Sequence, residues 1–168
     1  YPRGSRTRRV GVMATRGTLK SNRFQALLAS LGTLAEFICQ PCDGLAEAIE
    51  QNVHTDNAAK LIALCAKYTG AIGPFGTQPG QVDTLVLGCT HYPFVQMHLR
   101  DLTGPDVPFI ATGEPVARQT RRLLKASAAA AETGAGQIIM GTTGQVAHLK
   151  AATAQWLHWQ GRVDLLYI

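Results

Sequence analysis

Short, nearly all-apolar segments alternate with helix-like segments along the chain, and this alternation restricts the fold more than any other feature. The expected strands are residues 9–14, 34–39, 84–87, 107–111, 137–141 and 163–167. The expected helices are residues 21–31, 44–51, 56–68, a segment starting near 93, and residues 116–125 and 145–159. Alternating strands and helices form βαβ units, which build a parallel sheet. Strands this apolar are typical of a sheet covered on both faces. The sequence therefore predicts an α/β fold with a parallel sheet sandwiched by helices.

The composition is that of a folded protein. The chain has 168 residues, of which 46% are hydrophobic and 16% are charged. This length suffices for one domain with a core and a piece of another, and the composition argues against disorder. No apolar run approaches the roughly 18 residues of a membrane span. No signal peptide is visible, so we expect a cytoplasmic protein without a membrane partner.

The net charge of +5 raises the question of nucleic-acid binding. Arg3, Arg6, Arg8 and Arg9 supply four of these positive charges, which leaves the rest of the chain close to neutral. We therefore interpret residues 1–8 as a solvated basic tail and expect no nucleic-acid partner.

The four cysteines are Cys39, Cys42, Cys65 and Cys89. The first two form a C-x-x-C pair, whose alternatives are zinc binding and redox chemistry. A zinc site would need a second ligand pair, but the histidines are scattered singly. We therefore expect no metal and interpret Cys39, Cys42 and Cys65 as structural thiols in a reducing compartment.

Polar side chains follow three of the predicted strands. Thr15 and Thr18 follow the first, Cys89 and His91 follow the strand at 84–87, and Thr112 follows the strand at 107–111. Ligands of open α/β folds bind beyond the carboxyl ends of the strands, so these positions are candidates for a site. Helix capping is the alternative, and it explains Thr112 by itself.

Cys89 stands between the most apolar strand and a helix start. Backbone N–H groups and the helix dipole at such a position favour a thiolate, and they can also bind a carboxylate. His91 lies two residues further on and could hydrogen-bond the thiol. A buried structural cysteine is the alternative for Cys89.

Four segments resemble those of one enzyme family. Gly-Cys-Thr-His-Tyr-Pro at 88–93, preceded by Asp83, resembles the signature of glutamate racemases. The segment VGVMATRGTLKS at 10–21 is similar to the family's Ala-Thr-x-x-Thr segment. The segment FIATGEPVARQTRRLL at 109–124 is similar to the family's segment that follows the catalytic cysteine. Cys42 and Glu50 match a cysteine and a glutamate at the same spacing. These matches run in the family order over nearly the whole chain.

The resemblance implies a cofactor-independent enzyme that interconverts L- and D-glutamate and supplies D-glutamate for peptidoglycan. Cys89 would be the second of two cysteine acid/bases, and His91 would assist it. The substrate would be bound by Thr90, Thr15 and Thr18. Glu50 would have a supporting role, although a helix-surface carboxylate is its alternative interpretation. A homodimer is also expected.

The sequence departs from the family in its amino-terminal part. The family's Asp-Ser-x-x-Gly motif and the Asn-Thr after its first cysteine do not occur in the chain. By the family pattern, residues 9–111 form the second α/β domain, and residues 112–168 complete a first domain whose amino-terminal part is absent. We therefore expect the chain to be inactive alone. The alternatives are a non-catalytic binding or regulatory remnant, or a related aspartate or hydantoin racemase; the histidine after Cys-Thr favours glutamate.

Overall fold

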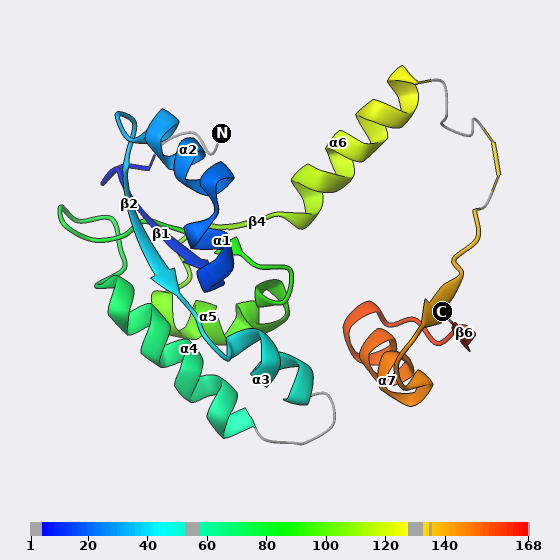
Figure 1. Ribbon diagram of the computed structural model, residues 1–168. Coiled ribbons are helices and arrows are strands. Elements are labelled where there is room, and N and C mark those ends of the chain that lie inside the picture. The colour runs from blue at the N-terminus through cyan, green and yellow to red at the C-terminus, as the bar shows by residue number, and fades with distance from the viewer. Residues whose placement is uncertain (1–4, 53–57, 128–132, 135, 168) are drawn as a thin grey trace.

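Four parallel strands form the main sheet of the computed structural model, which describes residues 5–52, 58–127, 133–134 and 136–167 (Figure 1). The strands are β1 (Arg9–Ala14), β2 (Glu36–Pro41), β3 (Thr84–Gly88) and β4 (Phe109–Ala111). Their order in the sheet is β2-β1-β3-β4. The predicted α/β fold with a parallel sheet flanked by helices is confirmed.

The described residues also form eight helical segments. They are α1 (Arg16–Lys20), α2 (Asn22–Leu31), α3 (Leu45–Asn52), α4 (Ala58–Ile72), the short 3-10 helix η1 (Tyr92–Val95), α5 (Gln96–Thr103), α6 (Gly113–Ala126) and α7 (Val146–Leu157). A second, two-stranded parallel sheet pairs β5 (Met140–Thr142) with β6 (Val163–Leu165). None of the helices in the described part of the chain is long and apolar enough to cross a membrane.

The core lies between the main sheet and the helices α3, α4, α5 and η1. Met13 and Leu87 of the sheet are fully buried there, together with Ile49 of α3, Tyr92 of η1 and Leu99 of α5. Burial of side chains of this size contributes about 1.5–3 kcal/mol each. This packing fixes α3 and η1 against the sheet, and both segments carry candidate site residues.

The strand register aligns the carboxyl ends of β1, β2 and β3 with one another in the main sheet. Ala14, the last residue of β1, is the Cα partner of both Pro41 and Gly88. A Cβ atom added at Gly88 would lie 3.0 Å from the Ala14 Cβ and 3.1 Å from the Met13 carbonyl oxygen. The glycine before Cys89 therefore lets β3 lie close to β1 just before the candidate thiol.

The structure corrects several element boundaries. Strands β4, β5 and β6 are three residues each, where residues 107–111, 137–141 and 163–167 were expected. The segment 15–18, expected to be a polar turn, starts helix α1, because the Thr15 side chain accepts a hydrogen bond from the Thr18 N–H and caps the helix. Strand β2 begins two residues later than expected because Leu34 still donates its N–H to Leu31 after helix α2. Helix α4 ends at Ile72, beyond its expected end at residue 68.

The segment after β4 is packed differently from the main sheet. Helix α6 has no buried residue, and it extends away from the sheet with Val116, Leu123 and Leu124 exposed (Figure 1). Helix α7 packs beside β5 and β6, and its Trp156 ring stacks on Phe94 with 4.7 Å between the centroids.

Candidate functional site

Two hydroxyl groups lie at the carboxyl end of β1. Thr15 is the N-cap of α1, and its Oγ1 lies 2.9 Å from the Oγ1 of Thr18. Both threonines are half-buried. Because Thr15 follows Ala14 and Cys89 follows Gly88, and these two preceding residues are paired, the hydroxyl pair and the thiol occupy the same edge of the sheet.

The thiol of Cys89 lies beside the imidazole of His91. The Cys89 Sγ and the His91 Nδ1 are 3.8 Å apart, and the Thr90 Oγ1 lies 3.5 Å from the same ring nitrogen. Cys89 is half-buried against the core, whereas Thr90 is exposed. The three consecutive residues thus present a thiol, a hydroxyl and an imidazole together, as the sequence predicted for this strand end.

The other nitrogen of His91 contacts Glu50. The His91 Nε2 and the Glu50 Oε1 are 2.7 Å apart, although the two residues are 41 positions apart in the sequence. When neutral His91 donates its Nε2–H to this carboxylate, its Nδ1 lone pair faces the Cys89 thiol. The line Glu50–His91–Cys89 can therefore take a proton from the thiol and return it.

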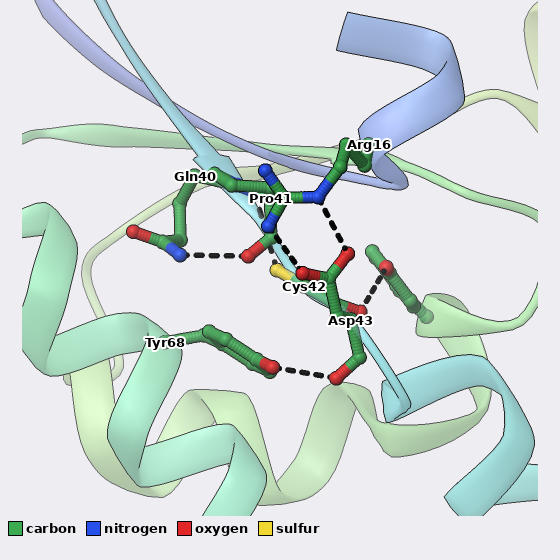
Figure 2. A network of polar contacts seen from close by, with 7 residues as sticks. Arg16, Gln40, Pro41, Cys42, Asp43 and Tyr68 are labelled. Atoms are coloured by element: carbon green, nitrogen blue, oxygen red, sulfur yellow. Dashed lines mark hydrogen bonds and ion pairs between the residues drawn. The ribbon is translucent and has the colours of Figure 1, made fainter.

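The turn between β2 and α3 joins several elements of the site (Figure 2). Arg16 of α1 makes a two-point ion pair with Asp43, in which its Nε donates to the Asp43 Oδ1 at 3.3 Å and its Nη2 contacts Oδ2. The Tyr68 hydroxyl donates to the Asp43 carbonyl at 2.5 Å, and the Tyr92 hydroxyl to the Cys42 carbonyl at 3.4 Å. The Arg16 guanidinium holds the pKa of the Asp43 carboxyl below its usual value. Neither Arg16 nor Asp43 belongs to a spacing pattern, so neither could be predicted as a site residue from the sequence.

A groove of about 650 Å3 borders the Glu50–His91 pair. Phe94 and, from α7, Leu149 and Trp156 also line this groove. Cys89, Thr15 and Thr18 are not among the lining residues, so the groove lies next to the histidine rather than at the thiol.

The remaining cysteines have different surroundings from Cys89. All four thiols are free. Burial raises the pKa of Cys42 to about 12 and that of Cys65 to about 11, and it also raises the pKa of the half-buried Cys39. Among the described residues, no three His, Cys, Asp or Glu side chains are grouped so that they could hold a metal ion.

These differences predict an order of thiol reactivity. Iodoacetamide at pH 8 is expected to modify Cys89 first, Cys39 more slowly, and Cys42 and Cys65 only after unfolding, because the thiolate is the reactive form and burial suppresses it. Mass mapping of alkylated peptides over time measures the order. In urea all four should react at similar rates, and faster native labelling of Cys42 than of Cys89 would contradict the assignment.

Comparison with known proteins identifies the family. The glutamate racemase of Pseudomonas paraeruginosa is 46% identical over 125 residues, covering 74% of the chain and 44% of that relative. The glutamate racemase of Cupriavidus pinatubonensis is 36% identical over 165 residues, covering 98% of the chain and 58% of the relative. The crystal structure of the glutamate racemase isoform RacE1 from Bacillus anthracis matches with a TM-score of 0.80 and 26% identity, over 96% of the chain and 58% of that protein. The chain belongs to the glutamate racemase family.

Two further findings bound this assignment. No protein-family model matches the chain. The chain spans about half the length of the curated glutamate racemases it matches, from 41% to 58% of each. The Francisella tularensis glutamate racemase, solved in complex with D-glutamate, shares the fold with a TM-score of 0.75 at 19% identity. The comparisons therefore show the family and the fold.

Proposed function

We propose that the chain contributes one of the two acid/bases of a glutamate racemase that works without a cofactor, and that Cys89 is this group. The observation that supports the proposal most strongly is the line Glu50–His91–Cys89 at the carboxyl edge of a parallel sheet. It places a thiol, a proton acceptor and an orienting carboxylate where ligands of such folds bind.

The reaction requires a base on each face of the substrate. The α-proton of an amino acid is very weakly acidic, and inversion passes through a planar carbanion. A thiolate on one face removes the proton and a thiol on the other face supplies one, so the substrate need not turn over. Cysteine suits this exchange because its reference pKa of roughly 8.5 lies close to neutral pH.

The hydroxyl groups of the site have a separate role in this proposal. Thr15, Thr18 and Thr90 bind the substrate's carboxylate and amino groups next to Cys89. Hydrogen-bond donors placed on the α-carboxylate stabilise the enolate-like charge that develops when the proton leaves. Thr15 also uses its hydroxyl oxygen to cap α1, which orients its side chain relative to this helix before any substrate binds.

The second thiol has to come from outside the part of the chain described here. Cys42 and Cys65 are buried thiols with raised pKa values, and Cys39 lies within strand β2. We propose that residues 9–111 form one domain of the enzyme and that residues 112–168 belong to the other. The exposed apolar side chains of α6 support this division, since they are the kind of surface that a missing part of the domain would cover.

The chain alone is therefore expected not to racemise glutamate. A single base can at most exchange the α-proton with retention of configuration. Purified chain should form no D-glutamate from L-glutamate and should self-associate through its exposed apolar surface, which a chiral assay and size-exclusion chromatography measure. Turnover at family level by a compact monomer would overturn the proposal.

A completed enzyme provides the positive arm of this test. The chain is 36% identical to the Cupriavidus pinatubonensis racemase over 98% of the chain's own length. The part of that racemase to which the chain does not align can therefore be fused to the chain. The fusion should racemise glutamate in preference to aspartate and hydantoins. A folded but inactive fusion would instead favour a non-catalytic remnant.

The biological setting is part of the same proposal. The completed enzyme would be a homodimer that acts in the cytoplasm. The D-glutamate that it makes would supply peptidoglycan. The relatives are named glutamate racemases of bacteria, which supports this setting. Rescue of a D-glutamate-requiring bacterial strain by the fusion tests it.

A further inference from the structure

Helix α1 carries two candidate substrate-binding hydroxyls, yet it has little apolar packing to hold it. None of its five residues is buried. The hydrogen bonds of its cap, from the Thr18 N–H to the Thr15 Oγ1 and from the Leu19 N–H to the Thr15 carbonyl, are internal to the helix. The position of α1 relative to the rest of the site therefore depends on contacts made by its polar side chains.

The ion pair between Arg16 and Asp43 ties α1 to the turn that follows β2, whereas the Gln25 side-chain amide of α2 donates to the Leu19 carbonyl at the other end of α1. Arg16 is the first residue of α1, and its guanidinium approaches Asp43 through Nε and Nη2 (Figure 2). A guanidinium and a carboxylate that meet at two points fix orientation as well as distance. Both side chains are 55% exposed, so the pair is expected to add little to the global stability.

Asp43 is itself firmly placed, which makes it a suitable anchor. The hydroxyl of the buried Tyr68 donates to its carbonyl, and the preceding Cys42 donates its N–H to the Ala14 carbonyl at 3.0 Å. The buried Tyr92, three residues after Cys89, donates its hydroxyl to the Cys42 carbonyl. The turn at Cys42 and Asp43 is thus attached to β1, to α4 and to the segment that follows the thiol.

We propose that the Arg16–Asp43 ion pair is a positioning link that holds the Thr15–Thr18 hydroxyl pair at a fixed place relative to Cys89. Arg16 and Asp43 are positioning residues, since they act through the threonines and do not touch the substrate. The proposal rests on the proposed function, in which these hydroxyls bind glutamate. The pair is charged at neutral pH, and because the Arg16 guanidinium lowers the pKa of Asp43, acid would remove the link only below that group's usual range.

A direct role of Arg16 in binding a substrate carboxylate makes the opposite prediction. Asp43→Asn would then free the guanidinium from its counter-charge and tighten substrate binding. If the ion pair is a positioning link, Asp43→Asn loosens α1 and weakens binding. The sign of the change in KM therefore separates the two roles.

The first experiment uses the chain itself. Amide hydrogen exchange is measured for Thr18 and Leu19 in the parent, Asp43→Asn and Arg16→Gln proteins. Both variants should raise these two exchange rates about fivefold, because loss of the ion pair lets α1 open locally more often. Amides of the buried helix α4 should not change. Unchanged exchange at Thr18 and Leu19 would overturn the link.

The chain offers a matched control at the other end of the same strands. Arg9 and Glu36 are paired in register on β1 and β2, and their side chains form an ion pair at 3.1 Å. Glu36→Gln removes one ion pair between the first residues of β1 and β2, at the end of these strands away from the hydroxyls. It should leave exchange at Thr18 and Leu19 unchanged, and an equal rise in this variant would show that the effect is not specific to the link.

The second experiment uses the completed enzyme described above. Asp43→Asn and Arg16→Gln should each raise KM for glutamate about five- to tenfold with kcat changed less than twofold, and the reversed pair Arg16→Asp with Asp43→Arg should restore KM in part. A lower KM in Asp43→Asn, or no change in KM, would overturn the proposal. An inactive parent enzyme would refute the proposed function alone, and the exchange rates would then decide whether the ion pair holds α1.

Discussion

Replacing Cys89 with serine is expected to lower the kcat of the completed racemase by at least about a thousandfold, within the range typical of a lost general acid/base. The serine hydroxyl is a much weaker acid than a thiol, so it cannot carry the negative charge between turnovers. Serine has nearly the size of cysteine, and Cys89 is half-buried, so the fold should be retained. Racemisation of both enantiomers, measured by circular dichroism of glutamate, gives the rate.

A second measurement separates loss of one base from general damage. In a two-base reaction each thiol removes the proton from one enantiomer, so exchange of the α-proton with deuterated solvent should fall more severely for one enantiomer than for the other. Cys39→Ser is the matched control, because Cys39 is also half-buried but lies within β2. Equal rates for Cys89→Ser and the parent would contradict the assignment of Cys89 as an acid/base.

Strands β1 and β3 could be predicted because their apolar runs are unambiguous. Strand β1 has the predicted bounds, and β3 differs from its prediction by a single residue. Helix α1 was missed, because a single turn held by the cap of Thr15 carries no periodic apolar face. The extension of α4 to Ile72 was missed for another reason. Thr69 and Gly70 indicated a loop, but Thr69 is buried and donates its hydroxyl to the Cys65 carbonyl within the helix.

The candidate site was predictable where its residues are close in sequence. Cys89 and His91 share one strand end, and their spacing indicated that the imidazole could hydrogen-bond either the thiol or a substrate group; the ring nitrogen lies 3.8 Å from the thiol. The contact of His91 with Glu50 joins residues 41 positions apart, and only the resemblance to a family suggested a role for this carboxylate. The pairing of Arg16 with Asp43 depends on how β1 and β2 align, which the composition of neither segment encodes.

The contact between Glu50 and His91 makes the second large prediction. His91→Asn should lower the kcat of the completed enzyme about a hundredfold, because it removes the proton acceptor beside Cys89. Glu50→Gln should lower kcat about tenfold, since it removes the carboxylate that orients the ring. Both effects should differ between the two directions of racemisation, because His91 serves only one of the two thiols. Initial rates from L- and from D-glutamate measure this asymmetry.

A double-mutant cycle tests whether Glu50 acts through His91. If it does, Glu50→Gln should have almost no further effect once His91 is asparagine, whereas independent roles would make the two losses multiply. Glu47→Gln is the matched control, because Glu47 lies on the same helix and accepts a hydrogen bond from Gln51 instead. Activity that disappears with a chelator and returns with zinc would assign His91 to a metal and contradict its role beside Cys89. Multiplicative losses would show that Glu50 does not act through His91. His91 would still assist the thiol, and Glu50 would be a carboxylate on the helix surface.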